Sequence, residues 1–382
     1  MNINWWPLSY NRKWLRFDLI AGLTSAAVVI PKAMAFAVIA GLPVEVGLYT
    51  ALVPMIIYAL LGTSKQLSVS TTTTIAILVA AEIAAIAPNA APNELITVAI
   101  TLAFMVGAFL ILASFLRLGF LANFISAPVL TGFKAGIAVV IIVDQIPKLL
   151  GIHITKGNFI QNILSIAHHL PATSIATLIL AIISLIIIFG TEWFFPRVPA
   201  PLLIIILGIF GAIMLNFHYH GIKLVGAIPT GLPSFSVVKL SLLQKLWPGA
   251  LGIALMSFME STAASKAFLA HNDPIPNSNR ELFALGAANL IGSFFQVMPS
   301  GGGTTQTVVN NRAGARSQAA ELITAAFVIL VLLFLTQLIS KIPYATLAAV
   351  VVATSIVLLN PADFYAGTCK HQVRQFSKTH SI

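Results

Sequence analysis

Long apolar runs, separated by short polar segments, follow one another along almost the whole chain. A helix that crosses a bilayer needs about 20 mostly apolar residues. Many of the runs reach that length, and together they predict about twelve membrane segments in an all-α polytopic protein. The clearest runs contain no charged residue: 95–116, 172–191, 198–217, 322–340 and 342–362. The remaining runs are shorter or interrupted: 17–38, 48–62, 70–87, 120–147, 248–270, 281–297 and 303–310.

The order of these segments repeats weakly within the chain. At an offset of about 232 residues Phe36 matches Phe268, and Thr72 matches Thr304. Equal spacing of several segments is the sign of two structural repeats. We therefore expect the following divisions: an interfacial segment 1–16, a first repeat 17–217, an outer loop 218–247, a second repeat 248–362 and a cytoplasmic tail 363–382.

The second repeat is shorter than the first on this arithmetic. The first repeat holds seven segments, of which 172–191 and 198–217 are the last two. Their partners would begin near residue 390, beyond the last residue of the sequence. We expect the second repeat to lack these two helices.

Composition supports the membrane interpretation. Hydrophobic residues make up 58% of the chain and charged residues 8%, with a mean hydropathy of +0.96. Soluble domains carry about 25% charged residues, so a cytosolic enzyme or a nucleic-acid binder is excluded. The net charge of +10 resides in short loops, and most of the basic residues fall on the side of the N-terminus. This distribution predicts a multi-pass protein of the cell inner membrane with a cytoplasmic N-terminus.

Sets of residues for enzyme chemistry are not found in the sequence. The single cysteine, Cys369, excludes a disulfide framework, and the histidines show no metal-binding spacing. We find no Ser/His/Asp set, Walker loop or HExxH motif. We expect neither an enzyme nor a cofactor or metal.

Two of the predicted segments are interrupted. Segment 3 opens with Ser70 and four threonines, and segment 10 follows Gly301–Gly303. Glycines disfavour helix, whereas Ser and Thr favour helix starts. We expect two half-helices whose N-termini face each other near the middle of the bilayer and bind an anion. The alternative is that the glycines form a loop and the threonines pack helices together.

Two charged residues lie far inside apolar runs, where an isolated charge is costly and usually functional. Glu260 lies in the middle of segment 8 and is a candidate for taking up H⁺ or binding Na⁺. Its alternative role is that of a structural acid hydrogen-bonded to a neighbouring helix. Lys32 follows Pro31 in segment 1, and its alternative is to extend toward the nearer membrane surface.

Short motifs stand in a distinctive order in both halves of the chain. They are Pro31–Ala37, Ala40–Pro43, Gly47–Tyr49, Gly62–Ser64, Leu67–Val69, Met259–Ser261, Asn279–Leu282, Ala284–Asn289, Asn310 and Ala313–Arg316. These motifs resemble the signatures of the SulP family of anion transporters, which includes sulfate permeases and bicarbonate transporters. The resemblance covers nearly the whole chain. It implies a seven-plus-seven inverted-repeat fold with a core and a gate domain, and a cytoplasmic STAS domain after the membrane part.

The resemblance also implies which residues form the site. An anion would lie between half-helices 3 and 10, and Glu260 matches the acidic residue associated with cation coupling. Many members have Gln where Lys32 stands and Arg where Gln306 stands, so the positive charge has changed sides of the pocket. Hydroxyl groups stand at Ser70 and Thr71, where many members have Gly-Pro. The expected anion-binding residues are Lys32, Phe36, Thr71, Thr72, Thr304, Thr305 and Gln306.

From these observations we expect secondary active transport of a small anion, such as sulfate, bicarbonate or a dicarboxylate, coupled to H⁺ or Na⁺ by alternating access. Three alternatives remain open: an anion channel on the same scaffold, an inactive or split-gene fragment, and, less favoured by the motifs, a nucleobase symporter. Two protein partners are left open. One is a second copy of the chain, in a homodimer, and the other is a second polypeptide that supplies the missing segments and the STAS domain. The other partners are the lipid bilayer, the anion and the coupling ion, and we expect no nucleic acid.

Overall fold

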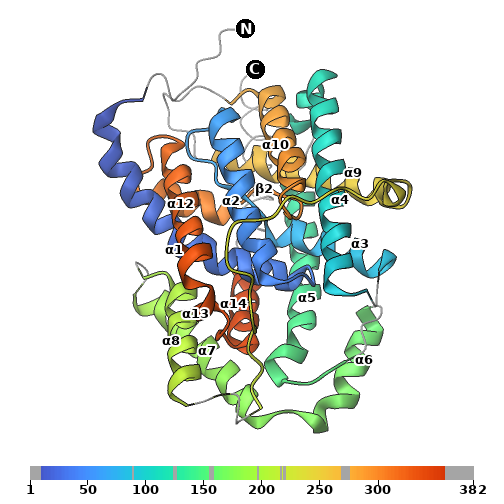
Figure 1. Ribbon diagram of the computed structural model, residues 1–382, viewed down its shortest axis with the longest axis vertical. Helices are drawn as coiled ribbons and strands as arrows, with labels where there is room; N and C mark the ends of the chain where they lie inside the picture. The colour runs from blue at the N-terminus through green and yellow to red at the C-terminus, as the bar shows by residue number, and fades with distance from the viewer. Residues whose placement is uncertain are drawn as a thin grey trace, which may run out of the picture.

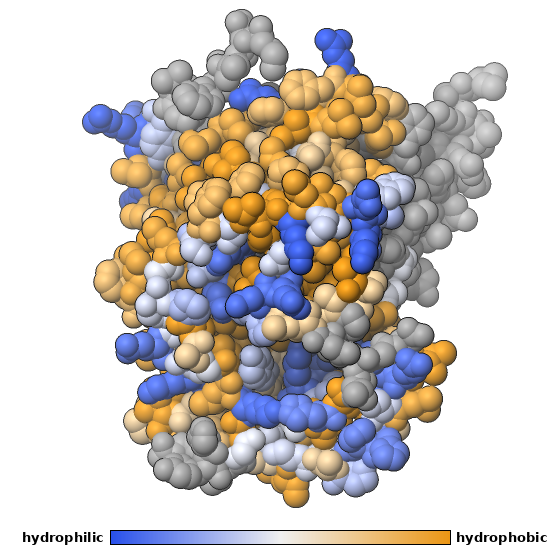
Figure 2. Space-filling view, turned by 45° about the vertical axis from the view of Figure 1, so that its right-hand side comes forward, coloured by the Kyte–Doolittle hydropathy of each residue, from blue (hydrophilic) through white to orange (hydrophobic). Residues whose placement is uncertain are grey.

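The computed structural model describes residues 10–87, 90–123, 127–154, 159–195, 198–215, 217, 221–267 and 276–357. Six of its helices are long and apolar enough to cross a membrane, and three shorter apolar helices accompany them. Figure 2 shows hydrophobic side chains over most of the upper part of one face, as expected for a surface in contact with lipid.

Most helices belong to one group, which we call the large bundle. Its helices are α1 (Leu15–Ile39), α2 (Val44–Leu61), α3 (Thr73–Ile86), α4 (Pro92–Phe115), α9 (Leu243–Ala267), α10 (Ser278–Ser293), α11 (Thr304–Arg312) and α12 (Ala319–Leu330). Helices from the two halves of the sequence alternate in the packing: α10 lies against α4 and α2, and α12 lies against α1. The largest hydrophobic core cluster also draws residues from both halves, so the two halves share the main core.

The second group, the small bundle, is formed by α5 (Ala127–Leu150), α7 (Ile175–Phe194), α8 (Ala200–Met214) and α14 (Tyr344–Val357). Helix α14 packs on α5 and α7, although it comes from the far end of the sequence. The short helix α6 (Phe159–His169) leads from α5 toward α7 at the lower end of the molecule in Figure 1. The two bundles meet where α1 packs against α14 and α8.

Two very short strands connect the halves inside the large bundle. Strand β1 (Val69–Ser70) pairs antiparallel with β2 (Gly301–Gly302), with Val69 opposite Gly302 and Ser70 opposite Gly301. Helix α3 starts three residues after β1, and α11 starts two residues after β2. Each interrupted segment therefore runs as a short strand followed by a half-helix; the half-helices were predicted, and the strands were not.

The structure confirms the polytopic helical class and differs from the expectation in three elements. Helix α6 was not predicted, because its apolar residues recur on one face only and do not form a continuous run. The β1–β2 pair was not predicted either. Segment 11 is broken into α12, a π-helical turn (Val331–Leu335) and α13 (Thr336–Ile339).

Some expectations concern residues outside the described ranges. These are the first nine residues of the interfacial segment, the tail 363–382, and Phe268, on which the repeat offset partly rests.

Candidate anion-binding site

Pairing of β1 with β2 places the starts of α3 and α11 side by side. The backbone N–H of Gly303 also donates to the Ser68 carbonyl oxygen at 3.0 Å. Because each strand is only two residues long, side chains from neighbouring helices must hold the rest of each extended segment in place.

Helices α9 and α10 hold the segment around β2. The Ser257 hydroxyl donates to the Ser300 carbonyl oxygen at 2.7 Å, and the Ser261 hydroxyl accepts from the Gly302 N–H at 2.6 Å. Asn289 accepts from the Ser300 N–H at 2.7 Å and donates to its carbonyl at 3.1 Å. A β-carbon at Gly302 would stand 2.9 Å from Cα of Ser261, so only glycine allows this approach.

The segment around β1 is held by the second half of the chain. Asn310 donates to the Gln66 carbonyl oxygen at 3.0 Å, and Gln318 donates to the Leu67 carbonyl oxygen at 3.0 Å. The Ser68 hydroxyl donates to Glu321 at 2.9 Å. Side chains around each extended segment thus form hydrogen bonds with its backbone N–H and C=O groups, which need such partners because they are buried.

The start of α3 is occupied by Glu260 of α9. Thr72 caps the helix by accepting from the Ile75 N–H at 3.3 Å, and its hydroxyl donates to one carboxylate oxygen of Glu260 at 2.7 Å. The Thr74 hydroxyl donates to the other oxygen at 2.7 Å. Glu260 is buried, and a carboxylate is favoured electrostatically at the positive end of a helix. The hydroxyl of Thr72 is therefore engaged by Glu260 in this state.

The start of α11 is open. Gly303 precedes the helix and provides no side-chain cap. Thr305, in the first turn, is exposed, and its hydroxyl accepts from the buried ammonium group of Lys32 at 3.3 Å. The cation of α1 thus lies at an uncapped helix N-terminus, where both favour an anion.

The other predicted residues belong to the same segments of the chain. The Ser70 hydroxyl donates to the buried side chain of Gln306 at 2.9 Å. The hydroxyl of Thr71 is buried and has no hydrogen-bond partner within the described part of the chain. Phe36 is buried one turn after Lys32 in α1, and Thr304 begins α11 and is half-buried. The predicted residues therefore lie in α1, in the first turn of α11 and just before α3.

Two acidic residues that the sequence analysis did not consider also matter here. Glu192 of α7 interacts electrostatically with Lys32, so the small bundle supplies a negative charge toward the site. Asp18 of α1 is fully buried and accepts from the backbone N–H groups of Arg316 and Ser317 at 2.7 and 3.1 Å. A single acid near the end of an apolar run is the only signal that the sequence offers for either residue.

Within the described ranges, no group of three His, Cys, Asp or Glu side chains is placed to hold a metal ion. The cation at the site is the Lys32 ammonium group.

Comparison with solved structures shows the same fold. Murine solute carrier 26 family member A9, an anion transporter in the inward-facing state, superimposes with a TM-score of 0.88 at 23% identity, covering 97% of this chain and 64% of that one. The transmembrane domain of the cyanobacterial bicarbonate transporter BicA superimposes with a TM-score of 0.82 at 24% identity, covering 95% and 97%. The inverted-repeat fold expected from the sequence is thereby confirmed.

Curated relatives are more similar in sequence. A probable sulfate transporter of Mycobacterium tuberculosis is 36% identical over 364 residues, which cover 93% of this chain and 64% of the relative. The chloroplastic sulfate transporter 4.1 of Arabidopsis thaliana is 36% identical over 360 residues, covering 91% and 52%. The chain thus spans between half and two thirds of the length of these relatives. The model of the sulfate permease family matches residues 15–376, and the chain belongs to this family of multi-pass membrane proteins.

Proposed function

We propose that this chain forms the membrane part of a secondary transporter that moves a small anion across the cytoplasmic membrane. The anion is bound by Lys32, by Thr304 and Thr305 at the start of α11, and by Gln306 and Thr71 beside them. Phe36 forms the apolar wall. The relatives' names support sulfate as the first candidate, and bicarbonate as the second.

One observation carries this proposal above the others: a buried lysine donates to a residue in the first turn of an uncapped half-helix. A helix N-terminus carries about +0.5 of an elementary charge. The N-terminus of α11 and the Lys32 ammonium group together form a positive site. Water screens these charges little because the lysine is buried. Thr305 is exposed, so protein does not seal this site.

Glu260 gives the site a means of coupling. Its carboxylate lies at the start of α3, between the hydroxyls of Thr72 and Thr74. While it is ionised, it cancels part of the positive end of α3 and disfavours a second anion nearby. Binding of H⁺ or Na⁺ removes that charge. The anion and the cation then favour each other's binding, which is the thermodynamic requirement for symport.

The two bundles give the site a means of alternating access. The large bundle holds the anion and corresponds to the core domain, and the small bundle corresponds to the gate. Lys32 moves with the core, whereas Glu192 belongs to the gate. Once an anion compensates Lys32, its attraction to Glu192 weakens, and the core can shift against the gate.

Uptake into proteoliposomes tests this proposal. The purified chain is reconstituted, and radioactive sulfate and bicarbonate uptake are measured with an inward H⁺ gradient, an inward Na⁺ gradient or neither. A secondary transporter accumulates its anion above the external concentration with one of the gradients. If the internal anion concentration only reaches the external one, and neither gradient changes this, the protein is an anion channel. No uptake under any of the three conditions would contradict the proposal.

A further inference from the structure

A basic cavity lies apart from the central site, within the small bundle. Its volume is about 310 Å³, and it is lined by the end of α5, the starts of α7 and α14, and the loop around residue 222. With a cytoplasmic N-terminus it opens at the outer side of the membrane. Its ten lining residues are Pro147, Lys148, Gly151, Ile152, His153, Thr177, Gly221, Lys223, Tyr344 and Ala345.

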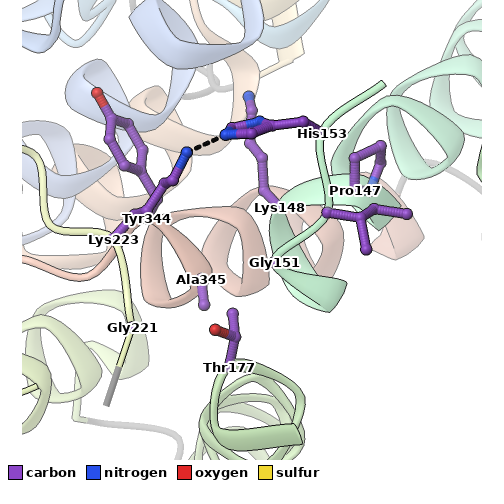
Figure 3. Close-up of a pocket in the computed structure, with 10 residues that line it drawn as sticks. Pro147, Lys148, Gly151, His153, Thr177, Gly221, Lys223, Tyr344 and Ala345 are labelled. Carbon is purple, nitrogen blue, oxygen red and sulfur yellow. Dashed lines mark hydrogen bonds between the residues drawn. The ribbon is translucent and has the colours of Figure 1, made fainter. Parts of the chain in front are cut away.

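The lining has one sign of charge. Lys148, Lys223 and His153 contribute basic groups, and none of the ten residues is acidic. Figure 3 shows the ammonium group of Lys223 directed at the ring of His153, to which it is hydrogen-bonded. Among the described residues, Glu45 of α2 is an acid near enough to Tyr344 to act on its hydroxyl electrostatically.

Two helix starts add to the positive potential. Thr177 lies in the first turn of α7, and Tyr344 and Ala345 form the first turn of α14. Each helix is longer than ten residues, so each directs the positive end of a full macrodipole toward the cavity. The Thr177 hydroxyl donates to the Ser174 hydroxyl oxygen at 3.0 Å and so belongs to the cap of α7.

Backbone hydrogen bonds hold the walls of the cavity in place. The Tyr344 N–H donates to the Lys223 carbonyl oxygen at 3.0 Å, and the Ser174 N–H donates to the Leu150 carbonyl oxygen at 3.0 Å. Gly151 turns the chain after α5 with a φ of +70°, and a β-carbon there would stand 2.9 Å from the Thr177 hydroxyl. The basic side chains therefore project from a framework that does not depend on them.

Lys148 also connects this cavity to the large bundle. Its ammonium group donates to the carbonyl oxygen of Val38 at 3.2 Å, in the last turn of α1, and to the side chain of Gln145 at 3.2 Å. An anion in the cavity would compete with the end of α1 for this lysine. Occupancy of the cavity would thereby loosen a contact between the two bundles.

We propose that this cavity is a second anion site, which binds an oxyanion of the sulfate or phosphate type through Lys148, Lys223 and the starts of α7 and α14. The oxyanion is either free in solution or the phosphate of a lipid head group, since both present the same chemistry. This site shares no lining residue with the central one, so it stands or fails independently of transport.

Equilibrium dialysis with radioactive sulfate tests the free-anion form. The full chain carrying Lys32→Gln, which weakens the central site, serves as the parent. In this background the double change Lys148→Gln and Lys223→Gln is expected to weaken sulfate binding about tenfold, as expected for the loss of charged donors. The charge-matched control is Lys239→Gln with Lys245→Gln, since both lysines are exposed and lie outside the cavity.

A second arm tests the lipid form. Native mass spectrometry counts the phosphatidylglycerol molecules retained by each variant in detergent, with phosphatidylcholine as the reference lipid. If one retained phosphatidylglycerol is lost when Lys148 and Lys223 are changed and kept when Lys239 and Lys245 are changed, the site is assigned to a lipid phosphate. Replacement by Arg at both positions retains binding, which distinguishes lost charge from lost folding. The proposal is overturned if neither sulfate affinity nor phosphatidylglycerol retention depends on the two lysines.

Discussion

At the residue scale, the buried charges of this protein have polar partners from distant parts of the chain. Glu260 accepts from two threonines of α3, and Asp18 accepts from the loop before α12. Glu281 of α10 accepts from the Tyr58 hydroxyl at 2.7 Å. Each pairing satisfies a group whose burial alone would cost several kcal/mol. Lys32 and Glu260 differ from the others because they lie at the two half-helix starts.

Replacement of Lys32 by Gln is expected to weaken anion affinity about tenfold, because the change removes the full positive charge beside α11 and retains a hydrogen-bond donor to Thr305. The measurement is sulfate binding to the purified chain by equilibrium dialysis. Lys245→Gln is the matched control, since it removes one exposed lysine far along the chain. Unchanged affinity in Lys32→Gln would reduce this lysine to a structural donor.

Replacement of Glu260 by Gln is expected to leave anion binding intact and to abolish accumulation driven by H⁺ or Na⁺. Gln retains an oxygen that can accept from Thr72 or Thr74, but it takes up neither cation. The measurement compares anion uptake by proteoliposomes with and without each gradient. A variant that still accumulates the anion would show that Glu260 only caps α3.

At the element scale, glycines set how closely helices approach. Helices α4 and α10 cross where a β-carbon at Gly107 would stand 2.8 Å from the Gly286 carbonyl oxygen. A β-carbon at Gly286 would stand 2.8 Å from the backbone nitrogen of Ile111. Small residues at a crossing allow close backbone contact, which is the main source of helix association in lipid. This crossing supports Ser300 and β2 through Asn289 of α10.

The change Gly286→Ala is therefore expected to destabilise the protein by about 1–3 kcal/mol, because the backbone of α4 must move to admit the methyl group. Its control is Gly252→Ala in α9, where a β-carbon would meet no atom within 4 Å. Thermal unfolding in detergent, followed by circular dichroism, measures the difference. Equal melting temperatures for the two variants would contradict this account of the crossing.

The same scale shows what sequence could predict. Hydropathy located the long helices because each must cover its own backbone in lipid. The interruptions before Thr73 and Thr304 were visible because Gly and Thr punctuate helices. Pairing of Val69 with Gly302 was not predicted, since it joins residues far apart in the sequence. The contact of Glu260 with Thr72 was missed for the same reason: local patterns do not identify distant partners.

At the scale of the whole molecule, the two halves of the chain are interleaved. Helices α1–α4 pack with α9–α12, and α5, α7 and α8 pack with α14. The half-helices meet inside the first group, so the proposed anion site is internal to one bundle and faces the other. Such an arrangement allows the site to move as a unit, which is what alternating access requires.

An anomalous-scattering experiment tests the central claim most directly. Crystals of the chain are grown with selenate, a sulfate analogue whose selenium can be located from its anomalous signal. Our account predicts a selenium peak between the starts of α3 and α11, within hydrogen-bonding reach of Lys32 and Thr305. Selenium found elsewhere in the molecule, with none between these two helix starts, would contradict it.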